Sequence, residues 1–415
     1  MKILILSQWF QPEPVFKGLP LAIALRDRGH EVEVLTGFPN YPGGRIYPGY
    51  RIRPWQREIM DGIRVNRVVL YPSHDKSGWR RTMNYLSFGL SAALIGNLLI
   101  KRPDVIYALN LVTLGLTTNL LKLRFRCPVI YDILDLWPDS VADSRMLDVS
   151  FLLKVLDRWS RYTYKSATHL ITVTPGMKYE LVRRGIDKSR ISIVYNWCNE
   201  EHMKPTPRDE SLAAKLELKG YFVVMFAGTM GVMQKLEVLL EAAERLKKTE
   251  PRIRFALVGG GVEYSRLKQI AVDRQLSNTI FLEKQPTENM GKILALADVT
   301  VVHLKDSPLF RITIPSKIQA YMAAGKPIIA GVRGDAESIL LASGAGKVVA
   351  PERPEAIAEC VVELYKMPEN ERNEMGLNGQ KFYKSKMSME AGVNTIEDIF
   401  IKYTKNRIEI VADPI

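Results

Sequence analysis

The chain has 415 residues, 47% of them hydrophobic and 25% charged, which is typical of a soluble globular protein with two or three domains. Its three cysteines stand far apart and its five histidines form no i, i+4 pair, which argues against a disulfide framework and a zinc site. The net charge of +13 is concentrated in residues 1–200, which carry 28 basic and 17 acidic side chains. An anionic partner is therefore predicted: acidic lipid headgroups, a phosphorylated substrate or nucleic acid, with improved solubility as the alternative.

The first predicted element is the apolar run after Lys2, which is too short for a signal peptide and indicates a buried strand. Further β-branched runs follow at 31–35, 65–69, 105–108, 129–132, 169–173 and 191–195, and in the second half at 222–227, 254–258, 279–282, 299–303, 327–330 and 346–349. Amphipathic stretches such as 19–28, 152–165, 236–248 and 264–274 lie between them. This alternation predicts an α/β protein with parallel sheets and helices on both faces.

The predicted domain boundary lies near residues 200–220, where a polar stretch contains Pro205 and Pro207 and a new sheet begins at Tyr221. We therefore expect two doubly wound, Rossmann-like domains, 1–200 and 201–387. Residues 388–415 are expected to form a C-terminal helix and tail that packs back toward the N-terminal domain.

The most apolar long stretch, residues 85–100, is shorter than a membrane span and is flanked by Arg80, Arg81, Lys101 and Arg102. It fits a helix lying in a membrane interface with its basic ends at the headgroups, and it fits a buried helix equally well.

In the second half, glycine turns follow two of the predicted strands, and a helix starts at Pro315-Ser316 beside Lys317. Glycine turns let backbone N–H groups approach a phosphate, and a helix N-terminus with a lysine is an anion site. Ser316 is expected to cap that helix and Gly325 to end it. Neither turn is the G-x-G-x-x-G of nicotinamide and flavin enzymes, so a phosphorylated nucleotide of another class is favoured over plain strand–helix connections.

In the first half, the strand at 129–132 leads to Asp135, Trp137 and Asp139. Asp135 is well placed for hydroxyl recognition or general-base work, whereas Asp139 fits a helix cap as well as a functional role. The loops at 8–18 and 36–44 are aromatic and amide-rich, which suits a sugar and also ordinary loop packing.

The second half resembles the nucleotide-sugar-binding domain of the family 4 retaining glycosyltransferases, which have the GT-B fold of two domains facing across a cleft. The resemblance rests on FAGTMGVMQKLEVLLEAAERL (226–246), FALVGGGVEYSRLK (255–268), TIPSKIQAYMAAGKPII (313–329) and GDAESILLASGAGKVV (334–349). In the first half, LAIALRDRGHEVEVLTGFPNYPGG (21–44), YDILDLWPDS (131–140) and VYNWCNEE (194–201) are similar to the same family. The bacterial O-antigen and capsule branch, which transfers N-acetylated amino sugars from UDP donors to lipid-linked acceptors, is the most similar.

This resemblance implies a metal-independent, retaining transferase without a cofactor, in which the UDP-sugar is a substrate. The acceptor would be a saccharide on a polyprenyl diphosphate, which places the enzyme in the cytoplasm at the inner, anionic face of the membrane. The expected donor-binding residues are Gly228, Thr229, Met230, Gly231, Gln234, Lys235, Gly259, Gly260, Gly261, Phe281, Lys284, Gln285, Pro315, Ser316 and Lys317. The expected acceptor-binding residues in the N-terminal domain are Phe16, Lys17, Gly18, Asn40, Tyr41 and Trp137.

The chain departs from the family pattern at charged positions. The two glutamates of the E-x7-E pair fall on Ile312 and Ala320, and the diphosphate-binding Arg and Lys fall near Thr229 and Gln234. The histidine that often precedes the first-domain aspartate is Leu134. We therefore expect Lys317 and Arg311 to replace the missing cations and, with Asp135, to be the catalytic residues.

Two other functions are open. One is a nucleotide-sugar epimerase or hydrolase on the same fold, and the other is a non-catalytic protein that binds an anionic surface. Nucleic acid is not expected as a partner, because the glycine turns and Ser316-Lys317 favour a nucleotide sugar.

Overall fold

The structure is a computed structural model that describes residues 1–73, 78–139 and 150–412. The chain forms two compact units. Unit 1 consists of Met1–Tyr195 and the segment from Gly392 onward, and unit 2 consists of Asn196–Ala391. The sequence placed these boundaries at 200/201 and 387/388.

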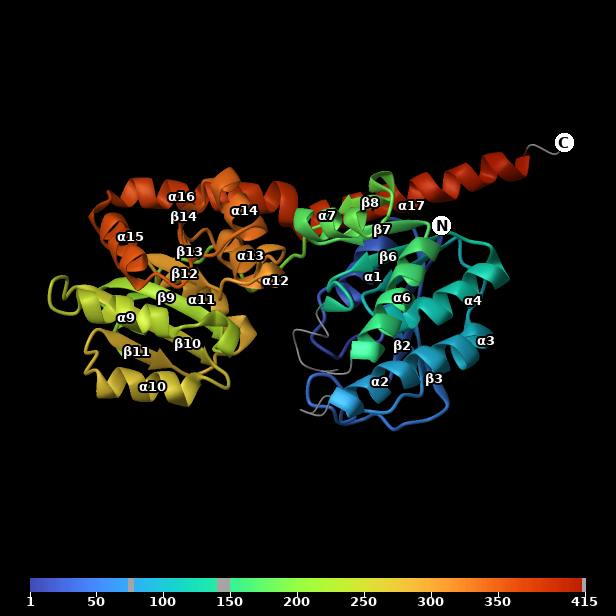
Figure 1. Ribbon diagram of the computed structural model, residues 1–415, viewed down its shortest axis with the longest axis horizontal. Helices are drawn as coiled ribbons and strands as arrows, with labels where there is room; N and C mark the ends of the chain where they lie inside the picture. Colours follow the sequence, from blue (N-terminus) through green and yellow to red (C-terminus); the bar gives the residue numbers. More distant parts are fainter. Residues whose placement is uncertain (74–77, 140–149, 413–415) are drawn as a thin grey trace. The chain divides into compact units, whose positions relative to one another are not determined.

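Unit 1 is built on an eight-stranded sheet in the order β3-β4-β2-β1-β5-β6-β7-β8. Figure 1 labels β2, β3, β6, β7 and β8 of this sheet. Its strands are β1 (Lys2–Leu6), β2 (Glu31–Gly37), β3 (Trp55–Met60), β4 (Ile63–Val68), β5 (Val105–Leu109), β6 (Val129–Ile133), β7 (His169–Thr172) and β8 (Ile191–Ile193). Its helices are α1 (Leu19–Asp27), α2 (Gly78–Ser91), α3 (Asn97–Leu99), α4 (Gly115–Phe125), α6 (Ser150–Ser166), α7 (Pro175–Arg183) and most of α17 (Met389–Ala412). A π-helical turn, η1 (Ala92–Gly96), joins α2 to α3, and short 3-10 turns occupy η2 (Val112–Leu114) and η3 (Lys188–Arg190).

All seven strands predicted for this half are present, but the sequence did not predict β3. It is the only antiparallel strand among the described residues, and it turns into β4 at Asp61-Gly62, both of which have positive φ. Glu58 on β3 pairs with the fully buried Arg67 on β4 at 2.5 Å, so an ion pair helps to hold this polar edge strand.

Helix α17 completes unit 1 from the far end of the chain. Glu397 accepts hydrogen bonds from Arg28 Nη1 at 2.6 Å, and its second carboxylate oxygen lies 2.7 Å from His30 Nε2. Further along, the Phe400 ring meets the Tyr107 ring edge-on with centroids 5.6 Å apart. The C-terminal segment therefore supplies part of the core and of the polar surface of unit 1.

Unit 2 is built on a six-stranded, all-parallel sheet in the order β11-β10-β9-β12-β13-β14. Its strands are β9 (Phe222–Thr229), β10 (Ile253–Gly260), β11 (Thr279–Leu282), β12 (Val299–His303), β13 (Ile328–Gly331) and β14 (Gly346–Val349), as predicted. Its helices are α8 (Glu210–Lys215), α9 (Glu237–Leu246), α10 (Tyr264–Asp273), α11 (Met290–Ala295), α12 (Pro308–Arg311), α13 (Ser316–Ala323), α14 (Asp335–Ser343), α15 (Pro354–Lys366) and α16 (Glu369–Phe382). Single turns lie at η4 (Val232–Gln234), η5 (Thr287–Asn289) and η6 (Tyr383–Met387).

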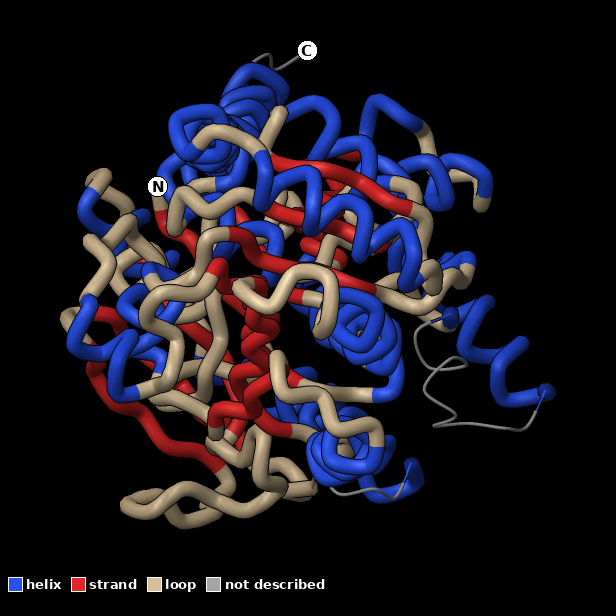
Figure 2. The backbone as a smooth tube through the Cα atoms, turned by 90° about the vertical axis from the view of Figure 1, so that its left-hand side faces the viewer, coloured by secondary structure: helices blue, strands red, loops and turns tan. Residues whose placement is uncertain are grey.

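The core of unit 2 follows from the sequence of β9, a continuous apolar run that is buried on both faces of the sheet. Phe222, Val224 and Phe226 pack against the apolar face of α9 and against α15. In Figure 2 most of the strands, in red, run through the middle of the picture, and helices, in blue, lie around them. The doubly wound α/β prediction is confirmed in both units. Within the described ranges, no helix is both long and apolar enough to cross a membrane.

Candidate functional site

Two glycine turns meet at the carboxyl ends of β9 and β10, where ligands bind to parallel sheets. Gly228 and Gly259 have φ of 140° and 135°, and a Cβ added to Gly259 would lie 2.1 Å from the Gly228 carbonyl oxygen. Met230 N–H donates to the Gly260 carbonyl at 2.8 Å, so the two turns are joined by their backbones. Only glycine permits this approach, which leaves backbone rather than side chains at the predicted phosphate position. The Met230 side chain is fully buried in the core.

Lys317 lies directly over the first of these turns. Its Nζ would be 3.0 Å from a Cβ on Gly228 and is 4.9 Å from the centre of the Phe226 ring. The Tyr321 hydroxyl, one helical turn on, contacts both Ala227 N at 2.8 Å and Ala227 O at 3.1 Å, and so holds α13 against the end of β9. Burial alone lowers the pKa of Lys317 to about 8. Within the described chain, no carboxylate lies at ion-pair distance from this ammonium.

Helix α13 begins at Ser316, as predicted, but Ser316 does not cap it. The N-cap position belongs to Pro315, no side chain caps the helix, and Ser316 is the exposed first helical residue. The predicted cap is wrong because a capping oxygen must come from the residue before the first helical residue, and proline has no such group. The expected end of the helix is confirmed, since Gly325 follows the C-cap with a φ of 67°.

Two of the other predicted cations, Lys235 and Arg311, are already paired with carboxylates. Lys235 Nζ lies 2.9 Å from Glu352, and Arg311 Nε lies 3.0 Å from Asp306. The side chains of Lys235 and Arg311 are 41% and 57% exposed, whereas the Lys317 ammonium is mostly buried. Of the three, Lys317 therefore has the charge least compensated by the protein.

Gln234, Phe281 and Gln285, which were also predicted to bind the donor, contact neighbouring residues of unit 2. Gln234 accepts a hydrogen bond from Gly231 N at 3.0 Å, which closes the turn after β9. Phe281 packs edge-on against Tyr264 with centroids 5.8 Å apart, while Lys284 is exposed and Gln285 donates to the Glu283 carbonyl at 3.0 Å. These residues lie at and beyond the end of β11.

In unit 1, Asp135 is exposed and held in place by Asn110. The Asn110 side chain accepts from Asp135 N at 2.9 Å and donates to Asp135 Oδ2 at 2.9 Å. Asn110 itself has a φ of 64°, a conformation that asparagine tolerates better than most residues. The predicted carboxylate is thus oriented by a residue at the end of the neighbouring strand, β5.

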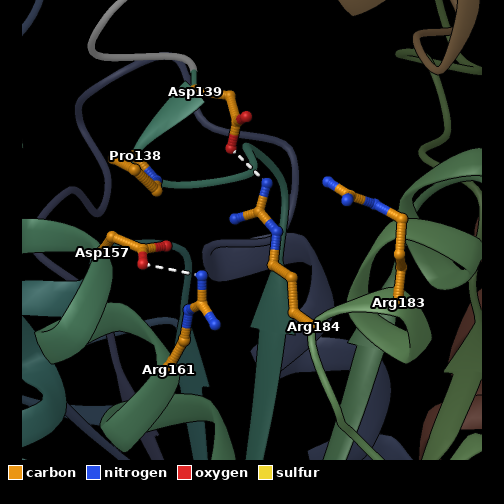
Figure 3. Close-up of a pocket in the computed structure, with 6 residues that line it drawn as sticks. All are labelled: Pro138, Asp139, Asp157, Arg161, Arg183 and Arg184. Carbon is orange, nitrogen blue, oxygen red and sulfur yellow. Dashed lines mark hydrogen bonds and ion pairs between the residues drawn. The ribbon is translucent and has the colours of Figure 1, made fainter. Parts of the chain in front are cut away.

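The same loop is held on its other side by Arg184 (Figure 3). Arg184 donates to Asp139 Oδ2 at 2.5 Å and to the Trp137 carbonyl at 2.9 Å, and it lines a cavity of about 340 Å³ with Arg161 and Arg183. Asp139 therefore supports the loop through an ion pair. The prediction that Asp139 caps a helix falls on residues 140–149, which lie outside the described ranges.

Aromatic side chains gather beside this loop. Trp9 contacts Tyr41 and Tyr85, with ring centroids 5.3 and 5.9 Å apart, and Tyr85 contacts Trp137 at 6.1 Å. The structure thus brings the predicted Tyr41 and Trp137 together through Trp9 and Tyr85, which the sequence had not assigned to the site. Phe16 is half exposed and takes no part in these ring contacts.

A buried acid organises the loops that carry these aromatic rings. The buried Glu13 accepts backbone hydrogen bonds from Phe10, Asn40 and Tyr41 at 2.7–2.9 Å, and so joins the loops after β1 and β2. Burial raises the pKa of Glu13 to about 7, against the effect of these N–H donors. Sequence reasoning missed Glu13; the only signal was a lone acid between Pro12 and Pro14.

The predicted acceptor residues Lys17, Gly18 and Asn40 also lie in these loops. Lys17 is buried, and its Nζ is 2.6 Å from Asp132, whose side chain has no exposed surface. The lysine therefore compensates a buried carboxylate that would be costly without an opposite charge. Gly18 has no room for a side chain, because a Cβ would lie 2.2 Å from Gln11 Oε1. Asn40 is buried and donates to the Phe38 carbonyl at 3.0 Å. Across the described residues, no cluster of three or more His, Cys, Asp or Glu side chains could hold a metal ion.

Comparison with known proteins identifies the class of enzyme. Residues 19–197 match the family described as glycosyl transferase 4-like domain, and residues 207–382 match the family described as glycosyl transferases group 1. The chain therefore belongs to the family 4 type of group 1 glycosyltransferases, and it is a transferase.

Two curated relatives are glycosyltransferases by name. The probable glycosyltransferase WbjE of Pseudomonas aeruginosa is 27% identical over 269 residues, which cover 64% of this chain and 66% of that protein. The putative colanic acid biosynthesis glycosyl transferase WcaI of Escherichia coli is 24% identical over 385 residues, 89% of this chain and 93% of that protein.

Solved structures agree on the fold. Sucrose-phosphate synthase from Thermosynechococcus elongatus matches with a TM-score of 0.69 and 17% identity, covering 97% of this chain and 98% of that one. Anabaena HepE in complex with UDP-glucose matches with a TM-score of 0.67 and 16% identity, covering 97% and 100%. The fold is therefore GT-B.

Proposed function

We propose that this glycosyltransferase moves a sugar, an N-acetylated amino sugar, from a UDP-sugar to a lipid-linked saccharide, with retention of configuration at the transferred carbon. The reaction belongs to the synthesis of a bacterial polysaccharide, and the enzyme works at the cytoplasmic face of the membrane. The name of WcaI, which refers to colanic acid biosynthesis, supports the polysaccharide role, and the UDP-glucose bound to HepE supports the donor class.

One observation carries the donor half of the proposal: the mostly buried Lys317 ammonium stands over the Gly228 turn without a carboxylate partner in the described chain. A buried charge is costly unless an opposite charge compensates it, and a diphosphate would do so. The first turn of α13 has no side-chain cap, so its N–H groups add positive potential at the same place. In this proposal the lysine and the helix N-terminus offset the charge on departing UDP, and no metal is required.

The acceptor half rests on unit 1. Trp9 and Tyr41 are partly exposed and offer aromatic faces of the kind that stack on sugars, and the buried rings of Tyr85 and Trp137 support them from behind. The exposed Asp135 lies on the same loop as Trp137. A further relative, the alpha-galactosylglucosyldiacylglycerol synthase of Streptococcus pneumoniae, is 28% identical over 163 residues, 37% of this chain and 42% of that protein. Its name describes a lipid product and supports a lipid-bound acceptor here.

A thermal-shift panel tests the donor assignment. At 100 times the dissociation constant, a ligand that binds only the folded protein adds about 2.7 kcal/mol to the free energy of unfolding. We expect UDP and UDP-N-acetylhexosamines to raise the melting temperature, and GDP- and TDP-sugars to leave it unchanged. A shift with GDP- or TDP-sugars alone would contradict the proposal.

Asp135→Asn tests the acceptor half, with Asp139→Asn as its matched control on the same loop. Asp135 is expected to contact an acceptor hydroxyl, so its loss should lower the transfer rate by about 100-fold or more and leave UDP affinity unchanged. Asp139 supports the loop through Arg184, so Asp139→Asn should lower the free energy of unfolding by about 1 kcal/mol and largely spare the rate. Equal transfer rates for Asp135→Asn and Asp139→Asn would show that Asp135 has no direct part in the reaction.

A further inference from the structure

A row of exposed leucines runs along one side of the continuous segment α2–η1–α3. Leu86, Leu90, Leu94 and Leu98 have exposed fractions of 44%, 53%, 66% and 77%, which increase toward the C-terminal end of the segment. The opposite side of the same segment, including Tyr85, Phe88 and Ala92, is buried. Single exposed leucines are ordinary, but a contiguous apolar row indicates a surface that binds something.

The π-helical turn keeps this row on one side. Leucines four residues apart drift by about 40° per step around an α-helix, so the fourth would be rotated far from the first. A π-helical turn rotates less per residue, and η1 lies between Leu90 and Leu98 and contains Leu94. The irregular turn therefore opposes the drift and aligns the leucines.

Neighbouring elements extend the apolar row and surround it with positive charge. Helix α4 packs beside α2 and η1, and Arg124 near its end donates to the Asn97 carbonyl on α3. Leu123 on α4 is 75% exposed and Trp79 at the start of α2 is 68% exposed. Residues 78–131 contain a single acid, Asp104, and seven basic residues, of which five are exposed and form the rim: Arg80, Lys101, Arg102, Arg124 and Arg126.

We propose that this surface, the leucine row with Trp79, Leu123 and its basic rim, lies on an anionic phospholipid bilayer. Leucine and tryptophan side chains enter the boundary between headgroups and acyl chains, while arginine and lysine side chains contact the lipid phosphates. The charge favours a lipid surface over a second copy of the chain, because a symmetric contact would bring two like-charged rims together. The inference rests on the proposed function, since a lipid-linked acceptor is presented at such a surface.

Co-sedimentation of the full-length protein with vesicles tests the leucine row. Vesicles of phosphatidylglycerol and phosphatidylcholine are compared with vesicles of phosphatidylcholine alone. Leu94→Ser/Leu98→Ser should weaken binding to the anionic vesicles by about tenfold or more, because each leucine loses burial in the bilayer. Leu341→Ser/Leu377→Ser, which changes leucines of unit 2 that are 65% and 52% exposed, should bind as the wild type does.

A second pair of variants tests the rim. Lys101→Glu/Arg102→Glu should weaken binding to the anionic vesicles by at least about 25-fold, because each cation near an anionic surface contributes about fivefold to the affinity. The loss of affinity should be smaller at high salt, which screens the charges. Lys384→Glu/Lys386→Glu, which reverses two exposed charges in unit 2, should have little effect. Circular dichroism and thermal melting establish that all four variants are folded.

The proposal is overturned if the wild type does not sediment with anionic vesicles, or if Leu94→Ser/Leu98→Ser binds them as tightly as the wild type. It is also overturned if that variant keeps vesicle binding but loses a dimer seen in sedimentation velocity, which would assign the surface to a second copy. UDP affinity, measured on the same samples, separates this failure from a failure of the proposed function. Loss of vesicle binding with unchanged UDP affinity is the expected result.

Discussion

Lys317→Met is expected to abolish UDP binding and, in the same protein, to raise the free energy of unfolding. The ammonium is mostly buried, and its burial lowers the pKa to about 8, which means that the folded state disfavours the charged form. Methionine has a similar length and no charge. At pH 7 we expect a gain of about 2 kcal/mol, after allowance for partial exposure, and a melting temperature higher by about 4 °C.

The difference in the free energy of unfolding between Lys317→Met and the wild type should depend on pH. The pKa of Lys317 is lower in the folded protein than in the unfolded chain, so between about pH 8 and 10.5 the unfolded chain binds more protons. The free energy of unfolding of the wild type therefore rises through this range relative to that of Lys317→Met, and the advantage of the variant disappears near pH 10.5. UDP binding to the wild type should weaken above about pH 8, where the ammonium is lost.

Calorimetric titration with UDP and thermal melting at pH 7 and pH 10 measure both effects. Lys235→Met is the control, because Glu352 already compensates that lysine. It should retain most of the UDP affinity and gain no stability. If Lys317→Met bound UDP as the wild type does, or if Lys235→Met alone lost binding, the donor site would have to be placed elsewhere.

Gly259→Ala is expected to destabilise the protein by about 3 kcal/mol or more. Its φ of 135° is strained for alanine, and the new Cβ would lie 2.1 Å from the Gly228 carbonyl, which belongs to the backbone and cannot rotate away. The two glycine turns would have to separate. Because Gly228 also lies under Lys317, UDP affinity should fall with stability.

Gly260→Ala is the matched control in the adjacent position. A Cβ there meets nothing within 4 Å, and its φ is not in the left-handed region. Its free energy of unfolding should stay within about 1 kcal/mol of the wild type in urea denaturation. Equal destabilisation by both variants would mean that the turns do not depend on their close backbone contact.

The sequence predicted the sheets well because the strands of a parallel sheet are buried on both faces and therefore appear as continuous apolar runs. The missed strand, β3, shows the limit of that signal. Half of its residues, WQREIM, are polar because it lies at an edge of the sheet, so it does not appear as a continuous apolar run. Glu58 is paired there with Arg67 of the next strand. The Asp61-Gly62 turn was a usable hairpin signal.

The candidate site was predictable where it depends on backbone conformation and less so where it depends on long-range pairing. Glycine turns and the start of α13 follow from local sequence. The pairing of Lys235 with Glu352 joins residues more than a hundred positions apart, and no local pattern reveals it. Glu13 and Tyr85 were missed for the same reason, since their roles come from loops and a helix brought together by the fold.

The contribution of α17 to unit 1 bears on the order in which the protein can be made. Phe400 packs on Tyr107, and Glu397 binds Arg28 and His30, so unit 1 lacks part of its interior until α17 has been translated. Unit 2 is one uninterrupted segment and has all of its strands earlier. During synthesis on the ribosome, the unit that starts first is therefore the one that finishes last.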